Sequence, residues 1–196
     1  QVIQIIKGDL SVFTNKLKKI LPHFTYLPFY VLSVPFVIFL RLISPIILIR
    51  WQEIISSRIG HFAANLELYL CEKESGVNTP SQYFFDIFFI GYKPVCNQQL
   101  FYMWKRVLRI FPKFLIYPIM IVNRVIPGGD AHEISTSSND RDVNNLYDTS
   151  SPHLFFTREE EQKGERGLLE LGIPRGAQFI CLTVRDSAYF PELSYH

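Results

Sequence analysis

Apolar stretches alternate with short polar turns along the first half of the chain. Apolar residues recur at mostly helical spacing over residues 1–22, and residues 24–40 carry no charge. A β-branched run over residues 45–51 is long enough for one buried strand, and residues 62–72 are rich in helix formers. A strand, a glycine-containing turn and a helix in this order predict the opening of a βαβ unit.

A second strand and a second helix are predicted next. Residues 83–90 combine aromatic and β-branched side chains, as strands do, and residues 97–109 predict a helix with Asn97 as its N-cap. An apolar stretch over residues 114–122 follows the basic end of this helix. This order of elements predicts an α/β fold.

The remainder of the chain is more polar. Residues 127–153 are predicted to form a loop, mobile or functional, because Gly, Ser, Thr, Asn and Asp cluster over an unusual length. Thr157 and Glu160 match a capping box, so a connecting helix is predicted within residues 154–174. The apolar run over residues 178–184 predicts a buried strand.

The uncharged run at residues 24–40 has two interpretations. A spanning helix needs about 20 apolar residues, and this run of 17 is shorter. We therefore interpret residues 1–45 as a membrane-associated segment that is embedded in the bilayer or lies along its surface. The lysines within residues 16–19 would then face anionic headgroups. The alternative is a buried core helix followed by a strand. Three prolines are expected to break the run: Pro28, Pro35 and Pro45.

Composition narrows the function classes. The 196 residues are 48% hydrophobic and 15% aromatic, which excludes a disordered chain. Residues 1–126 hold 14 Lys and Arg against 6 Asp and Glu, a balance of +8, whereas residues 127–196 hold 6 against 12, a balance of −6. A part that is both basic and apolar favours an anionic lipid surface over nucleic acid, for which the motifs are absent. The three cysteines form no CxxC pair, which argues against a disulfide framework or a zinc ribbon.

The first candidate site is the turn from Arg58 to His61, between a predicted strand and a predicted helix. Ligands of open α/β sheets bind at the carboxyl ends of strands, and a helix N-terminus attracts anions. Gly60 would let the backbone approach a ligand, Arg58 would contact a phosphate, and His61 would act as a general base. A purely structural turn is the alternative.

The second candidate site follows the predicted strand that ends at Val184. Arg185 would project into a strand-end crevice and hold a diphosphate, with Asp186 orienting it and Ser187 donating to phosphate. A surface Arg beside a capping Asp is the alternative. The chain lacks a P-loop, GxGxxG, HExxH and GxSxG, which argues against the enzyme classes that those motifs mark.

Several blocks of the chain carry a family resemblance. They are Arg58-Ile-Gly-His-Phe-Ala-Ala-Asn-Leu-Glu-Leu-Tyr-Leu, Lys93-Pro-Val-Cys-Asn-Gln-Gln-Leu with Met103-Trp-Lys-Arg, Phe156-Thr-Arg-Glu-Glu-Glu, Leu171-Gly-Ile-Pro, and Phe179-Ile-Cys-Leu-Thr-Val-Arg-Asp-Ser-Ala-Tyr. In order and spacing they resemble a bacterial family of glycosyltransferases associated with surface-carbohydrate gene clusters. The resemblance covers about residues 46–196. The strand followed by Arg185 and Asp186 is also distantly similar to the donor-binding motif of two-domain, GT-B-type fucosyltransferases. Thr183 stands where those enzymes often have a histidine, so the likeness does not specify the donor.

The resemblance implies a fold and a chemistry. Residues 46–126 would form a Rossmann-like N-terminal domain of a GT-B enzyme, and residues 175–196 would open a truncated second domain. The turn at Arg58 would face the interdomain cleft. His61 or Glu67 would deprotonate the acceptor, and neither a metal nor a cofactor would be needed. We expect the chain to be a fragment that is inactive alone.

The sequence therefore predicts a membrane-associated glycosyltransferase. It would move a sugar from a nucleotide-sugar donor to a lipid-linked or surface saccharide acceptor. Its expected location is the cytoplasmic face of the inner membrane, bound peripherally or anchored by one segment, without nucleic acid. The alternatives are a non-catalytic, membrane-anchored scaffold of a polysaccharide assembly complex and an enzyme of phosphate-ester or sulfo transfer.

Overall fold

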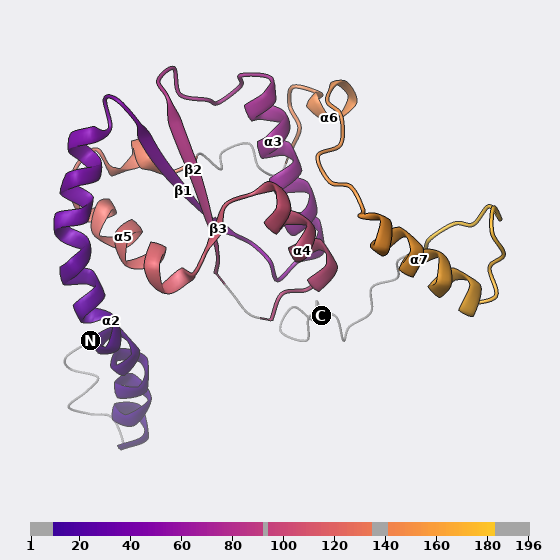
Figure 1. Cartoon of the computed structure of the whole chain (residues 1–196). Coiled ribbons are helices and arrows are strands. Elements are labelled where there is room, and N and C mark those ends of the chain that lie inside the picture. Colours follow the sequence, from indigo (N-terminus) through magenta and orange to yellow (C-terminus); the bar gives the residue numbers. More distant parts are fainter. Residues whose placement is uncertain (1–9, 92–93, 135–140, 183–196) are drawn as a thin grey trace. The chain divides into compact units, whose positions relative to one another are not determined.

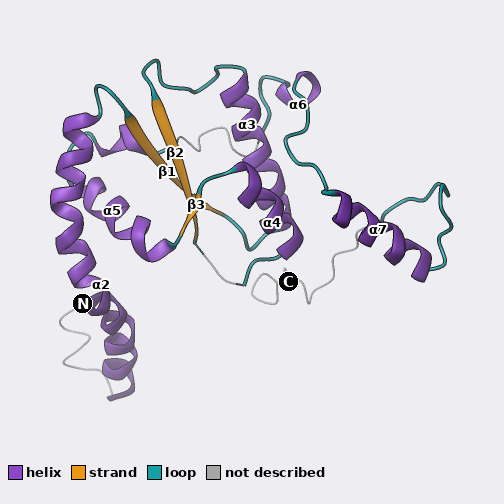
Figure 2. Cartoon of the chain, viewed as in Figure 1, coloured by secondary structure: helices purple, strands orange, loops and turns teal. Residues whose placement is uncertain are grey.

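The structure, a computed structural model, describes residues 10–91, 94–134 and 141–182. The chain divides into two compact units, Gln1–Phe155 and Phe156–His196. We describe each unit by itself. The first unit holds all the strands among the described residues, and the second holds one helix (Figure 2).

A three-stranded parallel sheet forms the centre of the first unit (Figure 1). Strand β1 (Leu48–Ile54) pairs along its whole length with β2 (Phe84–Ile90), and β2 pairs with the short β3 (Ile110–Phe111). The strand order β1-β2-β3 follows the sequence, and a helical crossover joins each pair, as parallel strands require. The predicted α/β fold class is therefore confirmed.

One face of the sheet is covered by the two crossovers. The first begins as a π-helix, η1 (His61–Asn65), and continues as α3 (Leu66–Glu74), and the second is α4 (Gln98–Val107). The Asn97 side chain accepts from the backbone N–H of Leu100, so the predicted N-cap of α4 is confirmed. A buried cluster fills the space between these helices and the sheet: Ile54, Phe62, Leu66, Tyr69, Leu70, Phe88, Trp104, Leu108 and Ile134.

The other face of the sheet is covered by two helices that pack along each other. They are α2 (Leu10–Ile43) and α5 (Lys113–Val125), seen together on the left of Figure 1. A second buried cluster lies between them and the strands: Leu40, Trp51, Ile87, Phe89, Ile116 and Met120. The sheet is therefore the middle layer of three, and the strand residues alternate between the two cores.

Helix α2 corrects the prediction that prolines would break the apolar run. Its backbone is helical through both Pro28 and Pro35 and ends at Ile43, just before Pro45. Each internal proline removes one backbone donor, at a cost of about 3 kcal/mol. Packing compensates, since a stripe at helical spacing is buried beside α5: Ser33, Val37 and Leu40.

The side of α2 away from this stripe is apolar and exposed. Val31, Leu32, Phe39 and Leu42 are each more than half exposed, with Leu42 at 74%. Among the helices that the structure describes, none combines the length and the apolar character needed to cross a bilayer.

The region predicted as a loop at residues 127–153 is more ordered than expected in its described part. It contains a 3-10 turn, η2 (Gly129–His132), a bridge from Glu133 to Trp51 of β1, and the short helix α6 (Leu146–Thr149). Isolated apolar residues, Ile134 and Leu146, are buried in two separate clusters. Single anchors of this kind leave no periodic signal, so the pattern could not reveal them.

His132 is buried in this region and gives the stability of the fold a pH dependence. Its ring stacks on Trp51, with centroids 5.3 Å apart, and Nδ1 lies 2.6 Å from the carbonyl oxygen of Ile49. Burial, with a smaller contribution from the charge on Arg41, lowers the pKa of His132 from 6.5. The fold therefore favours the neutral imidazole, whereas in the unfolded chain the ring binds a proton as the pH falls through about 6.5.

We therefore expect stability to fall as the pH drops from about 7.5 to about 5.5, through the unfolded pKa and toward the lower folded one. Urea unfolding at both pH values measures the slope, and His132→Asn should flatten it. An equal slope in the variant would assign the dependence to other groups.

The described part of the second unit holds helix α7 (Arg158–Glu170). The predicted capping box is confirmed, since Thr157 Oγ1 accepts from the N–H of Glu160 and the Glu160 carboxylate accepts from the N–H of Thr157. The predicted strand at 178–184 is wrong over residues 178–182, which form no strand, and Ile180 is 95% exposed. A strand needs a neighbour, and the described residues of this unit provide none.

Candidate functional site

The candidate site lies at the carboxyl end of β1. The chain leaves β1 at Ile54 and passes through the fully buried Ser56, whose carbonyl accepts from the N–H of Cys96, 2.9 Å away. Cys96 follows the end of β2, so this bond ties together the segments that leave two adjacent strands. Such an edge is where parallel α/β sheets bind ligands.

The first crossover helix begins directly after this bond. The N–H of Phe62 donates to the carbonyl of Arg58 at 2.9 Å, which closes the first helical turn. The amides of residues 59–61 lie within that first turn, and amides in this position carry the positive end of the helix dipole. The Arg58 side chain is exposed and His61 is half-buried beside them.

Gly60 adopts an ordinary helical backbone and lies beside open space. Its backbone is right-handed helical, with φ −61° and ψ −52°, and an added Cβ would meet no atom within 4 Å. Neither an unusual backbone angle nor a close protein neighbour requires glycine here. Its missing side chain does leave the helix start uncovered on that side, which suits approach by a bulky anion.

The π-helical turn of η1 was not predicted. His61 Nδ1 lies 3.4 Å from the Nδ2 of the buried Asn65, four residues on. The carbonyl of Phe62 in η1 also accepts from Trp104 Nε1 at 2.9 Å, so α4 holds η1 in place. Short π-helical turns are frequent at functional sites, and the spacing of residues in the sequence does not predict them.

The side chains of Lys113 and Glu53 lie beside Gly91, at the same carboxyl end of the strands. Lys113 Nζ donates to the carbonyl of Gly91 at 2.8 Å, and an added Cβ on Gly91 would overlap the carboxylate of Glu53. Glycine is therefore favoured at position 91 on steric grounds, because the Glu53 side chain occupies the space that a Cβ would need.

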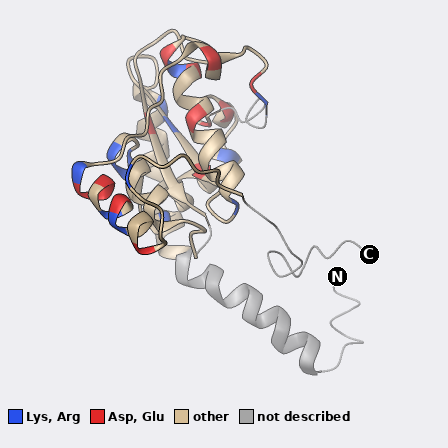
Figure 3. Cartoon of the chain, turned by 90° about the vertical axis from the view of Figure 1, so that its right-hand side faces the viewer, with Lys and Arg blue, Asp and Glu red and all other residues tan. Residues whose placement is uncertain are grey.

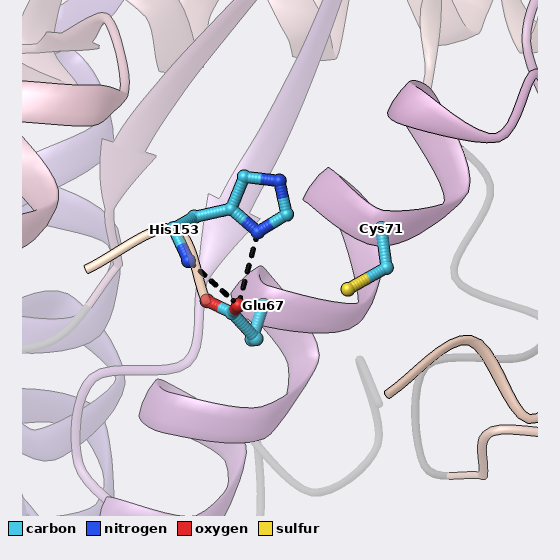
Figure 4. A group of neighbouring side chains, drawn as sticks. All are labelled: Glu67, Cys71 and His153. Carbon is cyan, nitrogen blue, oxygen red and sulfur yellow. Dashed lines mark hydrogen bonds and ion pairs between the residues drawn. The ribbon is translucent and has the colours of Figure 1, made fainter. Parts of the chain in front are cut away.

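Glu67 lies on another face of the helix from the residues around Arg58. Nine residues separate the two, which is roughly 13 Å along a helix. Its Oε1 accepts from the backbone N–H of His153 at 3.0 Å and lies 2.9 Å from His153 Nδ1. Cys71, one turn further along, completes a group whose donor atoms lie within 4.8 Å of one another (Figure 4).

The residues of the second predicted site, Arg185, Asp186 and Ser187, lie outside the described residues. The structure brings Arg58, Gly60 and His61 together at one helix start, as their spacing requires. His153 was missed by the sequence analysis, because it meets Glu67 across 86 positions without any local motif.

A charged cluster at the opposite, amino-terminal end of the strands was also missed. Acidic and basic residues are interspersed along the described chain (Figure 3), and one such pair, Arg50 and Asp86, is buried. Both Arg50 Nε and Nη2 donate to the Asp86 carboxylate at 2.8 Å, and Tyr69 OH donates to it at 2.5 Å. Burial, and then this hydrogen bond, raises the pKa of Tyr69, so it remains a neutral donor.

Beside this cluster lies a cavity of about 10 Å³, large enough for no more than one water molecule. Together with the full pairing of Arg50 and Asp86, this makes the amino-terminal end of the strands a structural centre. The carboxyl end remains the better candidate for a ligand.

Comparisons with known proteins give no relative: no protein-family model, no curated protein and no solved structure matches the chain.

Proposed function

We propose that the chain belongs to a membrane-associated glycosyltransferase of two Rossmann-like domains, which transfers a sugar from a nucleotide-sugar donor to a lipid-linked or surface saccharide. The observation that supports this proposal is the position of Arg58. It stands between the carboxyl end of a parallel strand and the start of a helix, next to a half-buried histidine. This arrangement suits a diphosphate, which a helix N-terminus and an arginine bind together.

In the proposed reaction the acceptor hydroxyl attacks the anomeric carbon of the donor sugar. The new carbon–oxygen bond forms as the bond from that carbon to the diphosphate breaks, and the hydroxyl proton passes to His61. The amides of residues 59–61 and the Arg58 guanidinium stabilise the charge on the leaving diphosphate. Arg185, with Asp186 and Ser187, would hold the diphosphate from the second domain. Glu67 is the less suitable base, since its carboxylate already accepts from His153.

Titration of the full-length protein with UDP-, GDP- and CDP-sugars tests this proposal. Arg58→Ala should weaken binding of the preferred donor about 10- to 100-fold, the loss of a charge-assisted hydrogen bond of ~1.5–3 kcal/mol. Arg185→Ala is expected to do the same, whereas Arg166→Ala, an exposed arginine on α7, should bind normally. If none of the three donors binds, the glycosyltransferase proposal is contradicted and the non-catalytic scaffold is favoured.

The scaffold remains the second candidate because the exposed apolar side of α2 supports membrane association with or without catalysis. We propose that this side rests on an anionic bilayer, at the cytoplasmic face of the inner membrane. Burial of Leu32 and Leu42 would each contribute roughly 1.5–3 kcal/mol.

Flotation with phosphatidylglycerol vesicles should therefore recover the protein with the lipid. The double variant Leu32→Ser, Leu42→Ser should remain in the soluble fraction. Leu171→Ser, at a comparably exposed position outside α2, should float as the wild type does. Equal flotation of the double variant would exclude this side of α2 as the contact.

A further inference from the structure

The outer face of α3 brings together three side chains with the donor atoms that zinc prefers. Glu67 and Cys71 are four residues apart on the helix, so both lie on one face. His153 comes from the segment after α6, and one donor atom from each residue lies within 4.8 Å of the other two (Figure 4).

The segment that carries His153 is held against α3 by independent contacts. Leu146 packs in a buried cluster with Leu68 and Cys71. Tyr147 OH donates to the carbonyl of Ala64 in η1, directly before α3, at 2.7 Å. Within the segment, the Asp142 carboxylate accepts from the two backbone amides at the start of α6, which fixes its own conformation. The histidine therefore reaches the helix from an already positioned segment, which lowers the entropic cost of forming a ligand set.

The two nitrogens of the His153 ring face different carboxylates. Nδ1 lies 2.9 Å from Glu67 Oε1, within the group, while Nε2 lies 3.4 Å from Glu74 Oε2, outside it. A metal-bound histidine typically gives its other ring N–H to a carboxylate, which fixes the tautomer. Glu74 is placed for that role when Nδ1 is the metal ligand.

The charges around Cys71 favour a cation. The carboxylates of Glu67 and Glu74 lie 2.9 Å and 3.4 Å from the two nitrogens of the His153 ring, so negative charge gathers beside the group. A divalent ion bound there would offset this negative charge.

We propose that Glu67, Cys71 and His153 bind one Zn²⁺ ion, with Glu74 as the hydrogen-bond partner of His153 and water as the fourth ligand. Nitrogen, sulfur and carboxylate oxygen together suit zinc, whereas magnesium and calcium prefer oxygen alone. Ligand atoms around tetrahedral zinc lie roughly 3.3–3.6 Å apart, given bonds of about 2.0–2.3 Å, so small side-chain rotations complete the site. The ion would clamp residues 141–155 to α3, and the site is independent of the proposed diphosphate site.

Titration of the full-length protein with Co²⁺, a spectroscopic substitute for Zn²⁺, tests this inference. One equivalent should produce a near-ultraviolet thiolate-to-cobalt band and visible bands of a tetrahedral ion, and Zn²⁺ should displace both. Cys71→Ser should abolish the near-ultraviolet band, and His153→Gln should weaken binding at least tenfold. Glu74→Gln should weaken it by about 10-fold or more, because the charged partner of His153 Nε2 is lost.

Cys96→Ser is the matched control, because it removes an exposed thiol and should leave the spectrum unchanged. Circular dichroism of each variant without metal shows whether it folds, and Zn²⁺ should raise the melting temperature of the wild type but not of His153→Gln. Absence of the thiolate band, or a band that survives in Cys71→Ser, would overturn the proposal.

Discussion

Replacing Asp86 with Ala is expected to lower the free energy of unfolding by about 3–5 kcal/mol. The side chains of Arg50 and Asp86 are only 6% and 1% exposed, so neither can turn to solvent. Without the carboxylate, a buried guanidinium loses two hydrogen bonds at 2.8 Å and Tyr69 loses its acceptor. Urea unfolding followed by circular dichroism measures the loss.

The exposed pair of Arg124 and Glu133 is the matched control. Its guanidinium and carboxylate are joined by two hydrogen bonds of 2.6 and 2.8 Å, but half of the arginine side chain is exposed. Glu133→Gln should therefore cost about 1 kcal/mol or less. Equal effects in the two variants would show that the Arg50–Asp86 pair is not buried as described.

Replacing Trp104 with Ala is expected to destabilise the first unit by about 3–5 kcal/mol. The indole is fully buried in the cluster between α3, α4 and the sheet, so its removal leaves a large cavity. Trp104→Phe should cost less, about 1–3 kcal/mol, because it mainly removes the hydrogen bond to the Phe62 carbonyl. Thermal unfolding of both variants measures the difference.

A further consequence concerns the candidate site, because Phe62 belongs to η1. If Trp104 holds this turn in place, Trp104→Phe should weaken donor binding without touching the donor. Tyr102→Phe, an exposed aromatic on the same helix, serves as control. If Trp104→Phe binds the donor normally, the hydrogen bond from Trp104 to η1 is not needed for donor binding.

The sequence predicted the elements whose signals are local. The β-branched and aromatic runs gave β1 and β2, and helix-forming residues gave α3. Asn97 and the pair of Thr157 and Glu160 predicted two helix starts that the structure confirms, because caps depend on a few adjacent residues.

Features that depend on distant contacts could not be predicted. Helix α2 continues through Pro28 and Pro35 because α5 packs beside it, which the pattern of one segment does not reveal. The apolar residues 178–182 resemble a strand but form none, since a strand is defined by its partner.

The candidate site divides in the same way. Arg58, Gly60 and His61 are neighbours in sequence, so a strand followed by a helix was enough to place them at the sheet edge. The meeting of His153 with Glu67 and Cys71 spans more than 80 residues and depends on where residues 141–155 fold back. The proposed part of the donor site at Arg185 remains a prediction.

Hydrogen–deuterium exchange of the full-length protein, with and without UDP-, GDP- and CDP-sugars, tests the central claim most directly. If the helix start after β1 binds the donor diphosphate, exchange at the amides of residues 59–61 should slow with at least one donor. Arg58→Ala should remove that protection and leave exchange in α5 unchanged. Binding that protects only other parts of the chain, or no protection with any donor, would contradict the account.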